Sequence, residues 1–448
     1  MSTSKQKSLP VLSWRVSTQG KPWADNGAVK AREKGRGGKV DVEIDSGATE
    51  QEIDGWGGCF NEMGWDALLA LKADAREAVL KGLFDPSTGC KFNICRMPIG
   101  ASDFALDYYS LNDHAGDYQM EKFSLERDRQ YLIPFIQAAM KHRPDLKIWG
   151  SPWTPPAWMK TYGLYYKGQL TWKPENLEAY ALYFSKYVQG YRSEGIHVYA
   201  VHIQNEPLHL PVFPSCWWEG REMRDFIRDY LGPRFKADKV DAEIWLGTIN
   251  GEKPFDSYAD WAEPTLRDPV ANAFVTGCGF QWFGDYCTPL VRKNYPDKKL
   301  MQSETKCGDG SNDWAYAEET FDLMRWYLEN GVNSYMQWNM VLDEMGTSAW
   351  GWKQSAMVTI DRTKRKAVFN PQFYLVKHFS YFVQPGARVL RMSGVPGDEI
   401  AFRNPDGSVV VVMANRTDRK LQLIVSVDGL RFDVTLPARS FHTFVRGA

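Results

Sequence analysis

The sequence predicts a (β/α)8 barrel fused to a small β-sandwich. Over roughly 300 residues, short apolar runs alternate with stretches of helical period, which is the pattern of an α/β barrel. The C-terminal segment instead shows short strands separated by turns, as in an all-β domain. A chain of 448 residues with 44% apolar residues is long enough to bury both cores.

Eight apolar runs are expected to form the barrel strands, because each is bounded by turn or helix signals. They occupy residues 51–60, 92–98, 146–152, 198–203, 242–249, 273–283, 299–304 and 332–339. Helical periods between them lie at residues 66–84, 125–139, 176–191 and 316–330. An open, doubly wound sheet is the alternative, but the turn after its first strand usually reads G-x-G-x-x-G, and this chain has G-W-G-G.

Both ends of the chain are expected to contribute to the sandwich. Five short strands (387–390, 399–402, 409–413, 421–427 and 432–434) follow a helix at 370–380. Residues 39–44 alternate apolar and charged side chains like a half-exposed antiparallel strand, and chain termini often lie close together. We therefore expect an N-terminal segment (1–48) that joins the sandwich, a barrel (49–365) and a C-terminal sandwich (366–448).

The composition argues against several kinds of partner. The 54 basic and 55 acidic residues give a net charge of −1, so no nucleic-acid partner is expected. No apolar run is long enough for a transmembrane helix. The first twenty residues lack the apolar stretch of a signal peptide, so the protein is cytoplasmic, or secreted or periplasmic if a leader was removed. A monomer is expected.

No metal or cofactor is expected either. The seven cysteines are an odd number without a C-x-x-C pair, which argues against a zinc site and against a disulfide framework. The seven histidines include no H-x-x-x-H pair. His202 falls within a barrel strand, where we expect a hydrogen-bonded core histidine.

Residues 198–208, V-Y-A-V-H-I-Q-N-E-P-L, contain the first candidate catalytic residue. Pro207 cannot donate to a sheet ladder, so the strand ends before it. Glu206 then lies at the carboxyl end of a strand, where barrel enzymes place their chemistry. Asn205 beside it is suited to hold a substrate hydroxyl. Taken alone, the motif is equally consistent with an ordinary loop carboxylate.

A second carboxylate, Glu304, ends a later strand in the sequence Q-S-E-T. Glycoside hydrolysis requires two such groups, one a protonated general acid and the other an ionised nucleophile or base. The 62 aromatic residues (18 Trp, 21 Tyr and 23 Phe) are compatible with a sugar site, because aromatic rings stack on the apolar faces of sugars. Polar and aromatic residues at other strand ends would join the pair: Arg96, Asp103, Trp153, Trp282 and Trp338.

These motifs resemble glycoside hydrolase family 30, the family that includes the glucosylceramidases. The shared motifs, in order along the chain, are G-W-G-G-C-F-N-E, C-R-M-P-I-G-A-S-D-F, S-P-W-T-P-P-A-W-M-K, Q-N-E-P, S-E-T, Q-W-N-M and K-H-F-S-Y-F-V. Residues 338–342 and 349–354 look most like the β-1,6-glucanase branch of the family.

The resemblance implies hydrolysis with retained anomeric configuration, with Glu206 as general acid/base and Glu304 as nucleophile. Asn205 would hold the sugar 2-hydroxyl, and Arg96 would help keep Glu304 ionised. The rest of the sugar would be held by Asp103, Trp153, Trp282 and Trp338.

One position departs from the family pattern. Glucosylceramidases have His-Trp-Tyr where this chain has Gln281-Trp282-Phe283. The missing phenol at Phe283 puts the transfer of ceramide-lipid specificity in doubt.

The expected substrate is therefore a β-1,6-glucan, with glucosylceramide and β-xylosides as alternatives of the same chemistry. A non-catalytic carbohydrate-binding barrel would usually lack a catalytic carboxylate, and both are present here. Endo or exo action depends on the loops at the barrel mouth, chiefly residues 161–171 and 209–218, and stays open.

Overall fold

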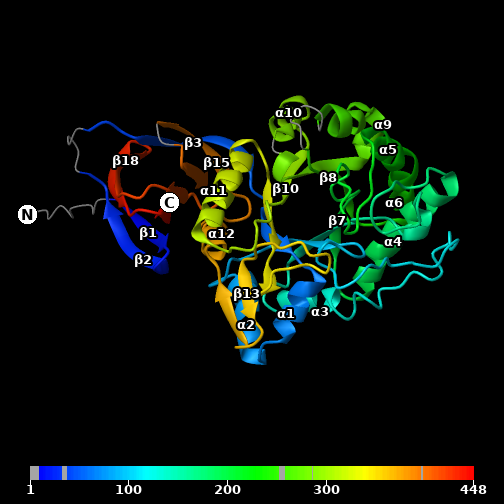
Figure 1. The fold of residues 1–448 in the computed structure, drawn as a ribbon. Coiled ribbons are helices and arrows are strands. Elements are labelled where there is room, and N and C mark those ends of the chain that lie inside the picture. Colours follow the sequence, from blue (N-terminus) through cyan, green and yellow to red (C-terminus); the bar gives the residue numbers. More distant parts are fainter. Residues whose placement is uncertain (1–9, 33–37, 252–257, 285, 395–396) are drawn as a thin grey trace, which may run out of the picture. The chain divides into compact units, whose positions relative to one another are not determined.

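The computed structural model describes residues 10–32, 38–251, 258–284, 286–394 and 397–448 (Figure 1). The chain forms two compact units. The larger contains residues 55–312 and 330–370, and the smaller contains residues up to 54 together with 313–329 and 371–448. The larger unit thus begins at residue 55 and ends at residue 370, whereas the sequence predicted a barrel from residue 49 to residue 365.

The larger unit is built on a closed barrel of parallel strands, which confirms the predicted (β/α)8 fold. The strands in order around the barrel are β4 (Gly55–Cys59), β5 (Ile94–Pro98), β6 (Lys147–Ser151), β7 (Val198–His202), β8 (Glu243–Ile249), β9 (Val275–Gln281), β10 (Lys299–Glu304) and β11 (Ser334–Asn339). Their side chains are almost all buried, as expected for parallel strands that are covered on both faces.

The glycines of the G-W-G-G motif let neighbouring strands approach closely. A Cβ added to Gly57 would lie 1.5 Å from the carbonyl oxygen of Ile94 on β5. Only glycine therefore fits at this position of β4. The motif belongs to the packing of the barrel and not to a phosphate-binding turn.

Helices surround the barrel, and two of them differ from the sequence prediction. The single helix expected at 66–84 is wrong, because the segment forms α1 (Glu62–Leu69) and α2 (Ala73–Phe84). Asn61 caps α1 early, since its Oδ1 accepts a hydrogen bond of 2.7 Å from the Gly64 N–H. α3 (Leu132–Met140) begins seven residues later than expected.

The other α-helices among the described residues of the larger unit are α4 (Pro174–Ser193), α5 (Gly220–Phe226), α6 (Gly232–Asp238), α8 (Glu263–Arg267), α9 (Pro269–Phe274) and α10 (Cys287–Asn294). A small sheet of β12 (Val341–Asp343), β13 (Val358–Asp361) and β14 (Lys366–Phe369) follows the last barrel strand. It anchors the segment that links β12 to β13, which lies beside the candidate site described below.

The smaller unit is the predicted β-sandwich. Its strands, in sheet order, are β19 (Leu430–Leu436), β18 (Leu421–Val427), β3 (Val42–Glu52), β15 (Arg388–Gly394), β16 (Glu399–Arg403), β17 (Val409–Asn415), β20 (Ser440–Arg446), β1 (Val11–Thr18) and β2 (Lys21–Lys30). The blue N-terminal and red C-terminal strands therefore lie in one sheet (Figure 1). A bridge between Ala31 and Phe432 joins its two ends.

The N-terminal contribution to the sandwich is larger than expected. β3 was anticipated from the alternation at residues 39–44, but β1 and β2 were not. Their sequences carry small, polar and charged residues on both faces, so the period of two is weak. The smaller unit also contains α11 (Trp314–Glu329), which the sequence assigned to the barrel, and α12 (Pro371–Ser380).

His202 lies inside the barrel, but the expected hydrogen bonds to its ring are wrong. The ring is fully buried and stacks on Trp149 at a centroid distance of 4.1 Å and on Trp245 at 5.4 Å. Neither ring nitrogen has a hydrogen-bond partner among the described residues. Burial lowers the pKa of His202 well below its usual value, so the ring is neutral.

A buried carboxylate in the loop after β5 predicts how stability depends on pH. Asp128 accepts hydrogen bonds from the hydroxyls of Tyr109 (3.0 Å) and Tyr191 (2.6 Å), and burial raises its pKa from 3.8 to about 7. Because the folded state binds this proton more tightly, the stabilisation is complete below about pH 4 and is lost as the pH rises through about 7.

We expect Asp128→Asn to remove this dependence. The shift corresponds to roughly 4 kcal/mol of unfolding free energy between pH 4 and pH 8, as an upper estimate. Urea unfolding of both proteins across this range measures the difference. Parallel curves of unfolding free energy against pH would show that Asp128 does not titrate there.

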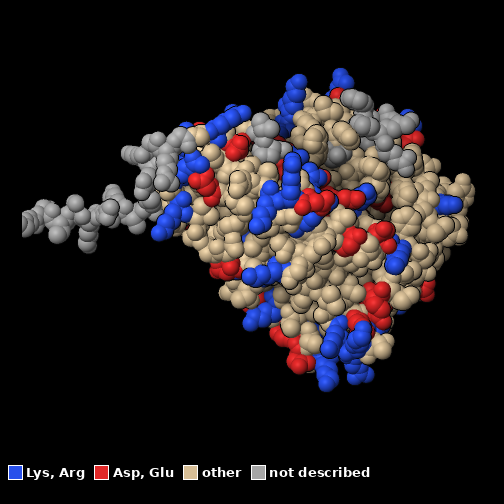
Figure 2. Space-filling model, turned by 60° about the vertical axis from the view of Figure 1, so that its left-hand side comes forward, with Lys and Arg blue, Asp and Glu red and all other residues tan. Residues whose placement is uncertain are grey.

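The surface fits the near-neutral composition, since basic and acidic side chains are interspersed on the face in Figure 2. Within the described ranges, no helix is long and apolar enough to cross a membrane. The same residues contain no group of three or more His, Cys, Asp or Glu side chains that could hold a metal ion.

Candidate active site

The candidate site lies at the carboxyl ends of the barrel strands and is organised around one buried arginine. Arg96 of β5 is completely buried, and its Nη1 lies 2.5 Å from Oε2 of Glu304, the last residue of β10. Nε and Nη2 of the same guanidinium donate to the Ser151 hydroxyl at 3.1 and 2.9 Å. Ser151 therefore positions the guanidinium, and the charged Nη1 group of Arg96 holds one carboxylate oxygen of Glu304.

Asn205 joins the same network through its amide oxygen. This Oδ1 accepts hydrogen bonds from Arg96 Nη2 (2.6 Å), Gln281 Nε2 (2.6 Å) and the Thr248 hydroxyl (3.2 Å). Gln281 Nε2 also donates to Glu304 Oε2 at 3.0 Å. Three donors around one oxygen settle the orientation of the amide, so the N–H groups of Asn205 point away from them.

Glu206 lies three residues after Ile203, the last residue of the apolar run, and its backbone conformation is unusual. Its φ of +46° is in the left-handed region, which non-glycine residues seldom adopt. The Glu206 N–H donates to the Thr248 carbonyl at 3.1 Å, and Asn250 Nδ2 donates to Glu206 Oε1 at 3.2 Å. Residues at and after the end of β8 thus hold Glu206 in this strained conformation.

The two glutamates differ in their electrostatic surroundings. Burial raises the pKa of Glu206 well above its usual value, and the charges of Glu304 and Asp103 raise it further. Burial also raises the pKa of Glu304, but the Arg96 guanidinium opposes that rise. Glu206 is therefore the group that holds a proton, while Glu304 is the better stabilised anion.

Two tryptophans and an aspartate form one wall of the site. The Trp153 and Trp338 rings lie 5.2 Å apart, and the Arg96 guanidinium carbon lies 4.5 Å from the first centroid and 5.4 Å from the second. Asp103 is buried near Glu304, and Gln354 Nε2 contacts its Oδ2 at 3.4 Å. Burial, and then the Glu304 charge, raise the pKa of Asp103 well above its usual range.

Several buried polar atoms of these residues have no protein partner. Within the described chain, no hydrogen bond reaches Asp103 Oδ1, the Trp338 indole N–H or Asn250 Oδ1. The Trp282 side chain lies within hydrogen-bonding reach of the Glu206 carboxyl and opposes the rise of its pKa. Buried polar groups in native proteins are nearly always paired. A concentration of unpaired ones around two carboxyl groups is typical of a site for a polar ligand.

The structure thus brings all eight sequence-predicted site residues to one end of the barrel. Sequence reasoning missed five others that complete the site: Thr248, Asn250, Gln281, Cys307 and Gln354. Cys307 contributes a thiol 3.6 Å from Glu304 Oε1. Thr248, Asn250, Gln281 and Cys307 lie within three residues of the carboxyl end of a barrel strand, which was the one available signal, whereas Gln354 lies in the segment between β12 and β13.

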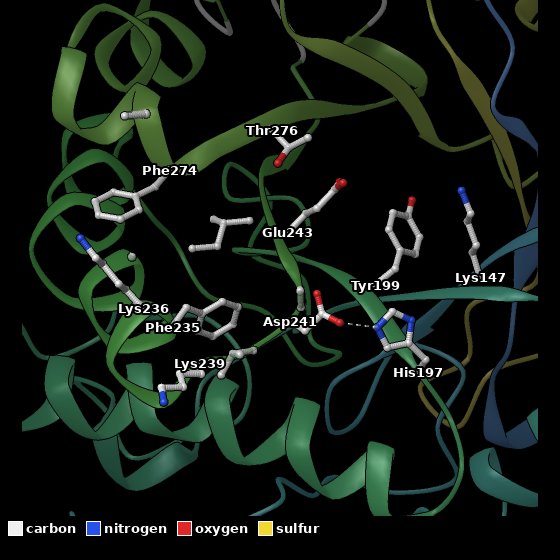
Figure 3. A pocket seen from close by; sticks show the side chains of 15 residues that line it. Lys147, His197, Tyr199, Phe235, Lys236, Lys239, Asp241, Glu243, Phe274 and Thr276 are labelled. Carbon is white, nitrogen blue, oxygen red and sulfur yellow. Dashed lines mark ion pairs between the residues drawn. The ribbon is translucent and has the colours of Figure 1, made fainter.

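A separate hollow of about 860 Å³ lies at the amino ends of β6 to β9 (Figure 3). Its lining includes Lys147, Tyr199 and Glu243, and His197 Nε2 lies 3.5 Å from Asp241 Oδ2 beside it. Residues at this end of such barrels usually serve stability, while catalysis takes place at the opposite end. We therefore place the chemistry at Glu206 and Glu304.

A (β/α)8 barrel with two buried carboxylic acids at the carboxyl ends of its strands is the architecture of a glycoside hydrolase. The chain matches the glycosyl hydrolase family 30 TIM-barrel domain over residues 53–383 and the family 30 beta sandwich domain over residues 396–444. It belongs to glycoside hydrolase family 30.

Relatives with two different activities are similar to this chain. The lysosomal acid glucosylceramidase of Mus musculus is 29% identical, with 94% of this chain and 85% of that protein aligned. The endo-1,6-beta-D-glucanase neg1 of Aspergillus fumigatus is 28% identical, with 91% and 87% aligned. The solved structure of the endo-beta1,6-glucanase BT3312 is 25% identical, with a TM-score of 0.85 and coverage of 98% and 99%.

Proposed function

We propose that the protein is a retaining glycosidase that cleaves β-1,6-glucan by double displacement. The observation that carries the proposal is the contrast between the two glutamates. Arg96 opposes the rise in pKa that burial causes at Glu304, so Glu304 is the better stabilised anion, whereas burial and the Glu304 charge raise the pKa of Glu206 well above its usual value. These are the protonation states that a nucleophile and a general acid need before the first step.

In the first step, Glu304 Oε1 or Oε2 attacks the anomeric carbon, and the glycosidic bond breaks. Glu206 donates its proton to the departing oxygen. Formation of the glycosyl ester removes the negative charge of Glu304. Since that charge is one of the causes that raise the pKa of Glu206, the pKa then falls. In the second step, Glu206 takes a proton from water, which attacks the ester and releases a sugar of retained configuration.

The unpaired polar atoms supply contacts for the sugar. With its amide oxygen already bonded three times, Asn205 has N–H donors for a 2-hydroxyl group. Asp103 Oδ1 and the Trp338 indole N–H are suited to other hydroxyls. Trp153 and Trp338 are almost completely buried and pack around Arg96, so they form the wall against which the sugar would lie. Arg96 has no exposed surface and therefore acts through Glu304 and Asn205.

The choice of β-1,6-glucan rests on two relatives and one residue. The Aspergillus fumigatus protein and BT3312 are both named endo-1,6-β-glucanases, and each aligns with nearly the whole chain. Phe283, where glucosylceramidases carry a tyrosine, is 47% exposed and packs on Trp282 with centroids 4.3 Å apart. Glucosylceramide is the second candidate, favoured by the 29% identity to the mouse glucosylceramidase.

Product analysis tests the substrate. We expect purified protein to release short oligosaccharides early in a digest of linear β-1,6-glucan. Glucosylceramide and an aryl β-xyloside, run in parallel, should be cleaved at far lower rates. An intact glucan alongside released ceramide or xylose would overturn the substrate and keep the two glutamates in their roles.

Replacing Arg96 tests how Glu304 is kept ionised. The guanidinium lowers the pKa of Glu304, so Arg96→Gln should raise that pKa, and the acid limb of the kcat/KM profile should move to higher pH. We also expect kcat/KM for an aryl β-glucoside to fall by about a hundredfold or more. Arg96→Lys, which keeps the charge, should shift the limb less. An acid limb at the wild-type position in Arg96→Gln would contradict this role.

A further inference from the structure

The loops at the rim of the site are joined to one another and form a rigid border. Ser215, in the loop after β7, donates its N–H to the Tyr165 carbonyl in the loop after β6 at 3.1 Å. The Tyr108 hydroxyl, in the loop after β5, donates to the Val212 carbonyl. These contacts involve both of the loops that the sequence singled out as deciding between endo and exo action.

A hairpin at residues 343–355 adds a fourth part to this border. The Ser348 N–H donates to the Trp352 carbonyl and the Gln354 N–H donates to the Gly346 carbonyl, both at 2.8 Å. The backbone at the tip of the hairpin is thereby fixed. The hairpin carries the tryptophans Trp350 and Trp352.

The base of the hairpin is attached to the candidate site. Gln354 contacts Asp103 through Nε2 at 3.4 Å and accepts a hydrogen bond of 2.7 Å from Asn339 Nδ2 through Oε1. Trp350 packs against the buried cluster that contains Trp153 and Trp338. The position of the hairpin is therefore set by residues that would hold the reacting sugar.

Aromatic rings continue outward from this cluster, and we call five of them the aromatic band: Tyr108, Tyr165, Phe213, Trp350 and Trp352. Tyr108 lies 4.9 Å from Trp350 and 5.6 Å from Tyr165, and the two tyrosine rings are nearly parallel at 12°. Phe213, a member of the cluster, lies 6.4 Å from Trp352. Trp352 ends the band and is 52% exposed.

We propose that the aromatic band binds the glucose units of the substrate chain that adjoin the unit held by Trp153 and Trp338. The inference rests on the proposed function and goes beyond it, because it assigns an extended binding surface and hence endo action. Aromatic rings that only completed the core would be buried, whereas the aromatic band ends in the half-exposed indole of Trp352 on the hairpin.

The chemistry of the band favours a sugar over the tail of a lipid. Tyrosine and tryptophan offer an apolar face together with a polar edge, which matches the alternation of C–H and O–H groups on glucose. Burial raises the pKa of the Tyr165 phenol, and a hydrogen bond to Asp113 and the charges of Asp113 and Asp107 raise it further, so two carboxylates lie beside this ring. Carboxylates accept hydrogen bonds from sugar hydroxyls, whereas they oppose the burial of an alkyl chain beside them.

The test compares β-1,6-linked gluco-oligosaccharides of increasing length with an aryl β-glucoside. For the wild type, we expect kcat/KM to rise with chain length. In Trp352→Ala the rise should flatten, so that the ratio of kcat/KM for the longest oligosaccharide to that for the aryl glucoside falls about tenfold. Trp326→Ala, which removes a partly exposed tryptophan of α11 in the smaller unit, should keep the wild-type ratio. An unchanged ratio in Trp352→Ala would overturn the proposal.

A binding measurement separates this proposal from the proposed function. Calorimetry on the Glu304→Gln protein, with and without Trp352→Ala, should show affinity that increases with oligosaccharide length only when Trp352 is present. Trp352→Phe, which keeps an aromatic ring at this position, should retain most of that increase. If the wild type hydrolyses the aryl glucoside but affinity does not increase with length, the band is excluded and the glycosidase chemistry stands. If the aryl glucoside is not hydrolysed, the proposed function fails while the affinity series still decides on the band.

Discussion

Glu304→Ala is expected to lower kcat for an aryl β-glucoside by about 10⁴-fold or more, because the variant lacks the nucleophile that forms the glycosyl ester. Arg96 and Gln281 both donate to this carboxylate, so its loss leaves a buried cation without its charged partner. Steady-state kinetics on purified protein measure the effect. Azide added to this variant should give a glucosyl azide of inverted configuration, since the anion then attacks the substrate directly.

Covalent labelling gives an independent view of the same residue. A 2-deoxy-2-fluoro glucoside with a good leaving group should modify the wild type on the peptide that contains Glu304, as seen by mass spectrometry. Glu121→Ala, at an exposed loop carboxylate, is a matched control and should behave like the wild type. Labelling of any other residue, or retention of near-normal turnover in Glu304→Ala, would remove Glu304 from the nucleophile's role.

Glu206→Ala is expected to separate substrates by their leaving groups. A poor leaving group needs a proton, so its kcat/KM should fall by about 10³-fold, whereas a dinitrophenyl glucoside should still form the glycosyl ester. The second step then lacks its base, and turnover should stall after a burst. Kinetics with a series of aryl glucosides measure this dependence on the pKa of the leaving group.

Azide should rescue Glu206→Ala with the opposite stereochemistry to Glu304→Ala. A small anion needs no general base, so it can attack the glycosyl ester in place of water, and the product should be a glucosyl azide of retained configuration. Rescue with inverted product would exchange the roles of the two glutamates. A uniform loss of activity across all leaving groups would remove Glu206 from acid/base catalysis.

The sequence predicted the positions of the two glutamates because strand ends are local features. The apolar run before Gln204 and the proline after Glu206 were enough to place one carboxylate, and the same pattern placed Glu304. Since parallel strands of a closed barrel end at one face, the two residues had to converge. The burial of Trp153 and Trp338 beside Arg96 follows from the same geometry.

Other parts of the site depend on contacts that no local pattern encodes. Gln281 was visible at a strand end, but its hydrogen bonds to Asn205 and Glu304 depend on how three strands are staggered around the barrel. The left-handed backbone of Glu206 depends on its bond to the Thr248 carbonyl of a neighbouring strand. Similarly, β1 and β2 owe their strand structure to pairing with β20 and with each other, not to their own period.

The stereochemistry of hydrolysis tests the central claim most directly. Proton NMR during cleavage of an aryl β-glucoside by the wild-type protein records the first sugar formed before mutarotation. Attack by Glu304 followed by water predicts β-glucose as the first product. Initial release of α-glucose would show that water attacks the substrate in a single step, which would contradict the roles assigned to both Glu304 and Glu206.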